Sequence, residues 1–353
     1  MIKFNKVTDT ELEFVIDDID VAYANAIRRV VLSEIPNVAP DVVTVHKNTS
    51  SMHNEFLSKR ISLIPLCFDE DETESFDKTK YKFVINKEGD ASNVVTTKDI
   101  SILDENNDVR DATFTAKIFP PDPITKDHIL LAWLKQGEMM HLEFNAQKNI
   151  SLNHHTKFCP VSTCTYFNTL DEKMVTEERR KVAAMAGDAN SNMNKFDALD
   201  KYRLFKKNEF GEACSFTFKI VSECRLTPFY LVGKAFEVLK AKLMSVEGKT
   251  VVETIHQESR FYALTVKDED HTIGNLLQVS IYNNYVRKNR IIDFAGYFQP
   301  HPLDNVIVFK LRFLEDKDDV KRFWSEAIRI TCGNIDVIQK SWLKPKLKKI
   351  TRR

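Results

Sequence analysis

The sequence predicts an α+β fold in which two pseudo-equivalent units, each running strand, helix, strand and long helix, pair within one chain. The first observation is a repeat at a constant offset of 250 residues: residues 14–27 read FVIDDIDVAYANAI, and residues 264–277 read LTVKDEDHTIGNLL. Both copies show an alternating apolar run, an acidic turn and then apolar residues at helical spacing. A later strand also repeats, as FKI and FKL. Finally, an irregular, mostly β segment interrupts the first copy only.

The first unit opens with a strand and a helix. Apolar and polar residues alternate over 11–16, which is typical of a strand with one buried face. A helix is predicted over about 21–34, because apolar side chains then recur at three- and four-residue steps. Asp20 is a suitable N-cap, and Pro36 cannot continue the helix.

The next segment is predicted to be a mostly β insert domain over residues 39–199. Prolines, acidic loops and short β-rich runs dominate it. It also contains a short helix at 52–60 and a charged helix near 172–186, which a polar loop at 187–192 follows.

The first unit then resumes, so that residues 1–38 and 200–250 form one discontinuous domain. A strand at 215–221 precedes a long helix with an apolar seam that includes Phe229, Phe236 and Leu239. Such a seam is typical of a helix that packs lengthwise on a partner helix.

The second unit is continuous over residues 258–353 and ends in a basic tail. Its helix is predicted at 272–285 and its second strand at 306–313, and a long closing helix carries Trp324 and Ile335 in a heptad-like seam. The two seams would bury each other, which gives an intramolecular pseudo-heterodimer.

Composition excludes several classes of protein. The chain has 353 residues and a formal net charge of zero, so no global positive field attracts nucleic acid or an anionic membrane. No apolar run approaches the roughly 20 residues of a membrane helix, and the first residues lack the apolar core of a signal peptide. Six cysteines in a chain of this length indicate no disulfide framework. We therefore expect an intracellular protein with no membrane partner.

No catalytic, cofactor or metal site is predicted. The sequence lacks a glycine-rich phosphate loop, a nucleophile elbow and a paired-histidine metalloprotease helix. Acidic clusters at 18–20 and 268–270 fit helix capping better than metal binding. The cluster at 69–71 lacks the glycine and the bidentate acid of a calcium loop. The group of His154, His155, Cys159 and Cys164 matches no common zinc spacing.

Two basic features are candidates for binding. Arg28 and Arg29 diverge by about 100° on a helix, so at least one leaves the apolar face and is available to a partner. The C-terminal group could contact phosphates, although a terminal charge run is more often solvated. Its members are Lys340, Lys344, Lys346, Lys348, Lys349, Arg352 and Arg353.

Long motifs resemble two subunits of RNA polymerases. Residues 25–36 (NAIRRVVLSEIP) and 53–66 (HNEFLSKRISLIPL) are similar to motifs of the alpha-like, third-largest subunits of cellular enzymes. Residues 270–277 (DHTIGNLL), 295–297 (AGY) and 300–303 (PHPL) resemble the smaller, eleventh-type partner subunit of archaeal and eukaryotic enzymes. The resemblance implies that the two subunits are fused, as in polymerases of large nucleocytoplasmic DNA viruses.

The resemblance implies a non-catalytic assembly platform for the two largest subunits, which carry the magnesium site. It implies direct contact with the second-largest subunit, a small zinc-binding subunit as neighbour, and DNA or RNA contact only through the complex. Residues implied to face a partner subunit are Arg28, Arg29, His53, Glu55, Phe56 and Arg60. Residues implied or predicted to lie in the dimerisation units are Asn25, Ile27, Phe229, Phe236, Leu239, Asn275, Leu276, Leu277, Trp324 and Ile335. The implied location is the nucleus, a cytoplasmic virus factory or the virion.

The sequence departs from the family in the middle domain. Many eukaryotic relatives carry a zinc-binding cysteine cluster there and some archaeal ones an iron-sulfur cluster, whereas only Cys67 of this chain falls in that region. Cys159 falls in a later strand of the middle domain, at a position that is usually serine in relatives. Two alternatives remain open. One is an independent nucleic-acid-binding factor that acts through the basic tail, and the other is a metal-dependent hydrolase.

Overall fold

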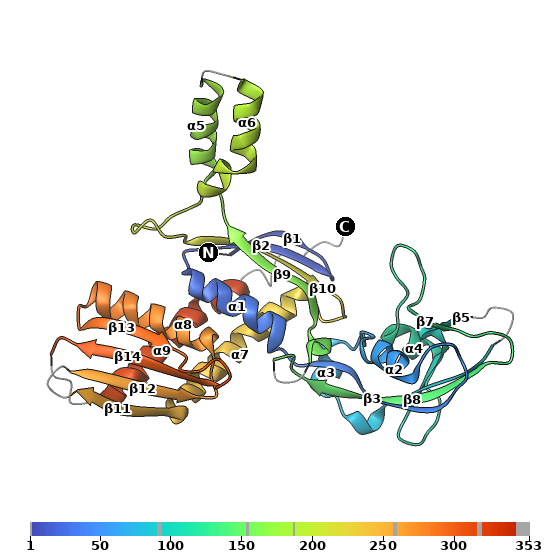
Figure 1. The fold of residues 1–353 in the computed structure, drawn as a ribbon. Coiled ribbons are helices and arrows are strands. Elements are labelled where there is room, and N and C mark those ends of the chain that lie inside the picture. The colour runs from blue at the N-terminus through green and yellow to red at the C-terminus, as the bar shows by residue number, and fades with distance from the viewer. Residues whose placement is uncertain are drawn as a thin grey trace.

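The computed structural model describes residues 2–89, 94–152, 155–185, 188–256, 260–315 and 320–343. In Figure 1 the first unit lies at the centre, the second unit to its left and an insert domain to its right, and a helical arm projects at the top. This mixed architecture confirms the predicted α+β fold class, with a first unit that an insert domain interrupts.

The first unit is an antiparallel sheet with two helices. The strand order is β1-β2-β10-β9, and residue Phe218 of β10 lies between Phe14 of β2 and Tyr166 of β9. The sheet strands are β1 (Ile2–Val7), β2 (Glu11–Asp17), β9 (Val161–Asn168) and β10 (Ser215–Ser222). The helices are α1 (Val21–Ser33) and α7 (Pro228–Lys249).

The second unit repeats this arrangement with the strand order β11-β12-β14-β13. Its strands are β11 (Thr250–His256), β12 (Phe261–Lys267), β13 (Ile292–Phe298) and β14 (Val306–Phe313). Its helices are α8 (His271–Ile281), the π-helix η5 (Tyr282–Lys288) and α9 (Val320–Leu343). Strand for strand and helix for helix, the two units follow the same order along the chain.

The repeat extends to backbone conformation and burial. Asp18 and Asp268, which lie 250 residues apart, both adopt a left-handed conformation, with φ of 64° and 55°. Asp20 and Asp270 then cap α1 and α8, each through a hydrogen bond from a backbone amide two residues later. Residues 21–30 and 271–280 have the same sequence of buried, half-buried and exposed positions. The two helices therefore sit in equivalent environments.

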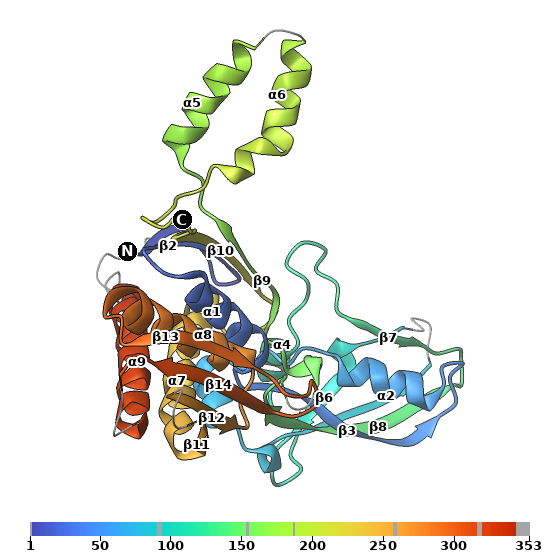
Figure 2. The same ribbon diagram turned by 60° about the vertical axis from the view of Figure 1, so that its left-hand side comes forward.

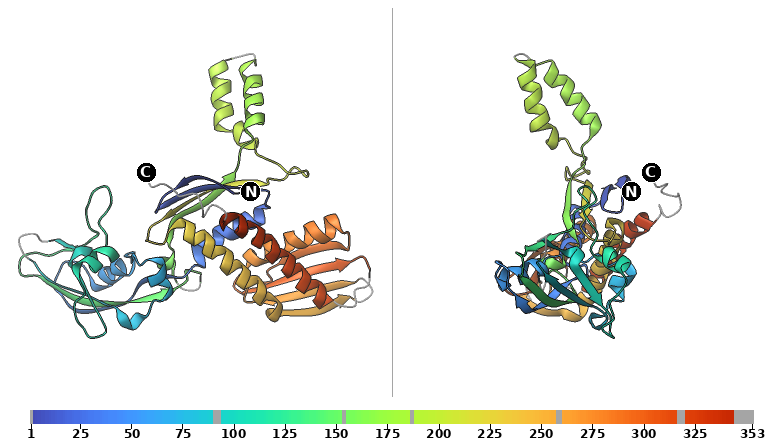
Figure 3. Two further views of the ribbon diagram at one scale, coloured as in Figure 1. Left: turned by 180° about the vertical axis from the view of Figure 1, so that it is seen from behind. Right: turned by 90° about the vertical axis from the view of Figure 1, so that its right-hand side faces the viewer.

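The four helices of the two units share one hydrophobic core. Helix α1 packs on α7 and α8, and α9 packs on α7 and α8 (Figure 3). Each long helix also reaches the other unit's sheet: α7 contacts β12, and α9 contacts β1. At the end of α9, Trp342 inserts among four phenylalanines of the first unit, namely Phe4, Phe14, Phe229 and Phe236.

The insert domain has its own core. Its main sheet has the order β3-β8-β4-β6, and β5 pairs with β7 beside it. The strands are β3 (Asn37–Asn48), β4 (Lys82–Glu88), β5 (Val94–Thr96), β6 (Ile100–Leu103), β7 (Leu130–Trp133) and β8 (Met139–Asn149). The helices are α2 (Asn54–Ser62), α3 (Glu70–Glu74), α4 (Ala112–Ile118) and the 3-10 turns η1 (Lys78–Lys80), η2 (Thr97–Asp99) and η3 (Thr156–Phe158). Buried residues of this domain form a hydrophobic cluster separate from that of the paired units.

A second interruption of the first unit lies between β9 and β10. We call residues 169–214 the arm; it contains α5 (Glu172–Ala183), α6 (Ala189–Ala198) and the 3-10 turn η4 (Asp200–Arg203). Its two helices pack on each other and extend away from the rest of the molecule (Figure 2). The corresponding connection in the second unit, between β13 and β14, is only residues 299–305.

Four details differ from the sequence-based expectations. The insert was predicted to run to residue 199, but β9 pairs with β10 and occupies the place that β13 has in the second unit. The expected polar loop at 187–192 overlaps α6, and the helix expected over 272–285 changes to a π-helix at Tyr282. Residues 251–257 were assigned to neither unit, but β11 (Thr250–His256) follows α7 directly and belongs to the second sheet.

Candidate subunit interfaces

Arg29 links the two units from the middle of α1. Its Nε donates to Oγ1 of Thr272 over 2.7 Å, and its Nη2 donates to Oδ2 of Asp270 over 2.8 Å. Asp270 is the N-cap of α8, so the guanidinium pairs with the same carboxylate that caps that helix. The sequence-based expectation placed Arg29 against a partner subunit. That expectation stays a prediction, and the hydrogen bonds give Arg29 a role inside the chain as well.

A charge network lies beside this contact. We call Glu34, Lys242, Lys249 and Glu269 the interface charge network. Lys242 Nζ lies 2.8 Å from Glu34 and 3.4 Å from Glu269, and Lys249 Nζ lies 2.9 Å from Glu269. Both carboxylates are buried. Burial alone would lower the pKa of Lys242, but the carboxylates outweigh it and raise that pKa. The lysine therefore stays charged and ties α7 to both units.

Arg28 takes a different direction from Arg29. Its Nε and Nη2 both donate to Oδ1 of Asn25, over 3.1 and 2.9 Å. The side chain remains half-buried on α1. Asn25 was predicted to take part in dimerisation, and here it orients Arg28, whereas Asn275 is half-buried at the equivalent position of α8.

The apolar residues predicted for dimerisation lie together. Phe229 packs on the edge of the shared core and stacks on Trp342 at a centroid distance of 4.7 Å. The others are buried in that core: Ile27, Phe236, Leu239, Leu276, Leu277, Trp324 and Ile335. Trp324 also donates from Nε1 to Oγ1 of Thr250 over 3.0 Å, at the start of β11.

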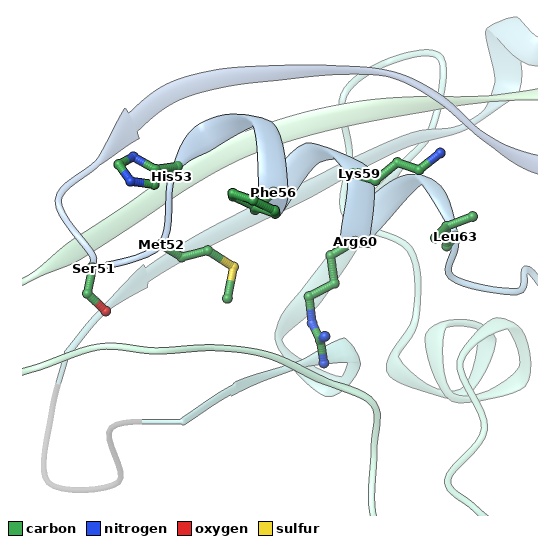
Figure 4. Close-up of a pocket in the computed structure, with 7 residues that line it drawn as sticks. All are labelled: Ser51, Met52, His53, Phe56, Lys59, Arg60 and Leu63. Atoms are coloured by element: carbon green, nitrogen blue, oxygen red, sulfur yellow. The ribbon is translucent and has the colours of Figure 1, made fainter.

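Helix α2 presents an apolar, basic surface on the insert domain. Leu57 and Ile61 are buried and hold the helix on its sheet, whereas Phe56 is 71% exposed. Arg60 is fixed by hydrogen bonds from Nε and Nη2 to the carbonyl of Leu130, over 3.0 and 2.5 Å. Figure 4 shows the side chains that border the open hollow of about 460 Å³ beside this helix. They are Ser51, Met52, His53, Phe56, Lys59, Arg60 and Leu63.

The two groups of residues predicted to face a partner subunit lie in different domains. Arg28 and Arg29 lie on α1 in the paired units, while α2, which carries Glu55, Phe56 and Arg60, lies in the insert domain (Figure 1). His53 precedes α2 and is exposed with Glu55.

The metal candidates are placed as follows. Asp20 and Asp270 each accept a backbone amide at a helix start, as the capping interpretation predicts. Asp69, for which no capping was predicted, does the same at the start of α3. Burial raises the pKa of the Cys67 thiol to about 11 and that of Cys164 to about 12, which disfavours the thiolate that a metal needs. His154 lies outside the described residues. Within the described ranges, no three His, Cys, Asp or Glu side chains converge on a possible metal position.

Sequence reasoning missed the interface charge network. Lys242 and Lys249 lie seven residues apart on α7, so they share a face that runs beside the apolar seam. Two lysines on the edge of a seam helix were the available signal.

None of the helices in the part of the chain that the structure describes is long and apolar enough to span a bilayer.

The fold and its shared core define a class of protein: two homologous dimerisation units that pair through their helices. Sequence comparison matches residues 13–243 to the RNA polymerase Rpb3/Rpb11 dimerisation domain, and residues 262–340 match a second description of the same domain. The chain therefore belongs to the Rpb3/Rpb11 dimerisation domain family and matches that domain in two stretches.

Individual relatives agree with this assignment. DNA-directed RNA polymerase subunit Rpo3 of Methanosphaera stadtmanae is 27% identical over 269 residues, covering 68% of this chain and 95% of the relative. Subunit 3B of DNA-directed RNA polymerases IV and V of Arabidopsis thaliana is 29% identical over 180 residues, covering 47% of this chain and 56% of the relative. Subunit RPAC1 of DNA-directed RNA polymerases I and III of Mus musculus is 31% identical over 180 residues, covering 46% and 52%.

For the last two relatives, the chain spans only about half of their length. All three are subunits of an enzyme complex, which agrees with the prediction that this chain is a non-catalytic subunit rather than an enzyme itself.

Proposed function

We propose that this chain is a non-catalytic assembly platform of a multisubunit DNA-directed RNA polymerase, in which an alpha-like subunit and its small partner are permanently joined. The observation that carries the proposal is the single core that α1, α7, α8 and α9 build from both units. A pair built in one chain needs no second polypeptide to complete it. Tethering also replaces a concentration-dependent encounter by a high effective concentration.

The second-largest polymerase subunit is the proposed direct partner, and the surface around α2 is its proposed contact. An exposed aromatic side chain between basic groups is a common centre of a protein interface, since aromatic and arginine side chains dominate binding energies. Phe56 and Arg60 supply both elements on one helix. Arg28 would add a second contact from α1, and a small zinc-binding subunit would sit beside the platform. DNA and RNA would be reached only through the assembled enzyme.

Co-purification tests the proposal. A tagged chain is expected to retain the two largest polymerase subunits, and failure to retain them in native extracts would sink the idea. Within the complex, Phe56→Ala should weaken recruitment of the second-largest subunit while leaving the isolated chain folded, because the side chain is mostly exposed. Phe167→Ala on β9 is the matched control, since Phe167 is 55% exposed outside the α2 hollow.

Single variants of Arg28 and Arg29 test whether one arginine of α1 serves recruitment and the other serves stability. Arg28→Ala should lower recruitment without loss of stability. Arg29→Ala should instead destabilise the isolated chain, because Asp270 and Thr272 lose their partner. Equal behaviour of the two variants would contradict this division.

The competing function is nucleic-acid binding through the basic tail. Lys344, Lys346, Lys348, Lys349, Arg352 and Arg353 lie outside the described residues. If the tail acts alone, the isolated chain should bind nucleic acid with a steep salt dependence, and deletion after Trp342 should abolish binding. The platform proposal expects recruitment of the large subunits to survive that deletion.

We further propose that the complex is the polymerase of a large nucleocytoplasmic DNA virus, acting in the nucleus or a cytoplasmic virus factory or packaged in the virion. The fusion of both units in one chain supports this origin. Mass analysis of the native complex would identify the neighbouring subunits, and a complex made only of host polymerase subunits would refute the proposal.

A further inference from the structure

Two departures from the internal repeat carry an additional inference. The first is the arm, which stands where the second unit has only residues 299–305. The second is the π-helix η5, which extends α8; the corresponding chain after α1 leaves for the insert domain instead. The arm therefore has no counterpart in the second unit, and η5 has none in the first.

These two elements contact each other. Arg287 of η5 donates from Nη2 to Oε1 of Glu212 over 2.6 Å and from Nη1 to Oε2 over 3.1 Å. Glu212 lies at the base of the arm, just before β10. The guanidinium also lies 4.4 Å from the ring centroid of Phe210 and 4.9 Å from that of Tyr282. The arginine is thus held between two rings and a two-point carboxylate contact.

The arm base is shaped to receive this arginine. Oδ1 of Asn208 accepts the amides of Phe210 and Glu212, each over 2.9 Å, which folds residues 208–212 into a tight turn. The side-chain Nδ2 of Asn208 also donates to Oε2 of Glu212 over 3.1 Å. Arg287 and Asn208 lower the pKa of Glu212 to about 2, so the carboxylate is charged throughout the physiological range.

The π-helix supplies the matching geometry on the other side. A π-helix bonds each amide to the carbonyl five residues earlier, so its wider turns change the direction of side chains relative to an α-helix. Tyr285 is buried and anchors η5 on the second unit, beside Phe323 of α9. Asn284 Nδ2 donates to the carbonyl of Ser280 over 2.8 Å at the junction with α8.

We propose that Arg287 is a clamp that fixes the base of the arm to the second unit, so that the second unit sets the direction in which α5 and α6 project. On the other side, Lys206 ties the arm base to the first unit, with its Nζ 2.9 Å from Oδ1 of Asp17 on β2. Helix α5 has no buried residue, and the arm helices pack mainly on each other and on η4. Short helices of this kind depend on tertiary contacts for their order. The proposal does not depend on the polymerase assignment.

Hydrogen exchange on the full chain tests the clamp. Arg287→Ala is expected to speed exchange of the hydrogen-bonded amides at the arm base, those of Asn208, Gly211 and Glu212, by on the order of tenfold. Core amides of β14 and α8 should be unchanged. Arg179→Ala is the matched control, because Arg179 pairs with Asp197 within the arm and reaches neither unit.

The result that would overturn the proposal is unchanged exchange at the arm base in Arg287→Ala, or an equal increase in Arg179→Ala. If Arg287→Ala loosens η5 as a whole, Glu212→Gln provides the second test, since it removes the charge from the arm side and leaves η5 intact. Faster exchange confined to the arm base supports the clamp in that variant, and no change refutes it.

Discussion

Replacing Trp342 by alanine should separate the two units more than any other single truncation in the shared core. The indole belongs to the second unit, but its neighbours belong to the first. Its ring centroid lies 5.2 Å from Phe4, 5.0 Å from Phe14, 4.7 Å from Phe229 and 6.0 Å from Phe236. Trp342 is fully buried, so the truncation leaves a cavity at the point where the end of α9 meets the first sheet.

The magnitude follows from the area involved. An aromatic side chain of this size buries about 150–250 Å², which at about 25 cal/mol per Å² corresponds to roughly 4–6 kcal/mol. Alanine keeps part of this area and the site relaxes partly, so we expect a loss of about 3–5 kcal/mol. No hydrogen bond is lost in addition, because the indole Nε1 has no partner among the described residues. A loss of this size is a large part of the 5–15 kcal/mol that typically stabilises a domain.

Native-state hydrogen exchange provides the assay, since it resolves the units separately. Protection should fall in β1, β2 and α7, although the substitution lies in α9, and it should persist in the insert domain, which has its own core. Leu343→Ala, at a neighbouring residue that is 46% exposed, should cost less than about 0.5 kcal/mol. A loss below about 1 kcal/mol in Trp342→Ala, or one shared equally by the insert domain, would refute the reasoning.

Three other substitutions test the second unit and the interface. Gly274→Ala should cost roughly 1–3 kcal/mol by thermal unfolding, because a Cβ there would lie 2.5 Å from Cε2 of Tyr297; an unchanged melting temperature would contradict this. Burial alone would raise the pKa of Asp270, but hydrogen bonds from Thr272 outweigh it and lower that pKa. The stabilisation by this carboxylate is thus present above the ordinary aspartate pKa of 3.8 and is lost as the pH falls below it. Asp270→Asn should therefore be less stable than the unchanged chain at neutral pH. Its free energy of unfolding in urea should also fall less steeply as the pH is lowered through this range. Lys242→Met should cost about 3 kcal/mol, since it takes the paired cation from the buried Glu34 and leaves Glu269 with Lys249 alone; an unshifted urea midpoint would count against the network.

Much of the fold was predictable because its signals are local. The capping aspartates Asp20 and Asp270 and the apolar seams of the long helices depend on spacing within one element. The constant offset between the two copies then required only that like sequences fold alike. The buried seam residues of both long helices lie in the shared core.

The remaining features depend on contacts between distant segments. Nothing near Arg29 in the sequence indicates that Asp270 will meet it, because that contact exists only after the two units pair. The strand at 161–168 gives the same local signal whether it belongs to the insert or to the first sheet. Helix α6 was missed because its first turns are rich in asparagine and serine, which favour turns. Its N-cap at Asp188 and the burial of Phe196 overcome that preference.

The junction between the units has a consequence for stoichiometry. Helix α7 ends at Lys249 and β11 begins at Thr250, so no loop separates the last helix of one half from the first strand of the other. Both residues are held in place, Lys249 by Glu269 and Thr250 by Trp324. Exchange of halves between two molecules requires a hinge, and this position provides none. Each chain therefore delivers the two halves in a fixed ratio of one to one, already in register, and a cell that makes this protein cannot accumulate one half without the other.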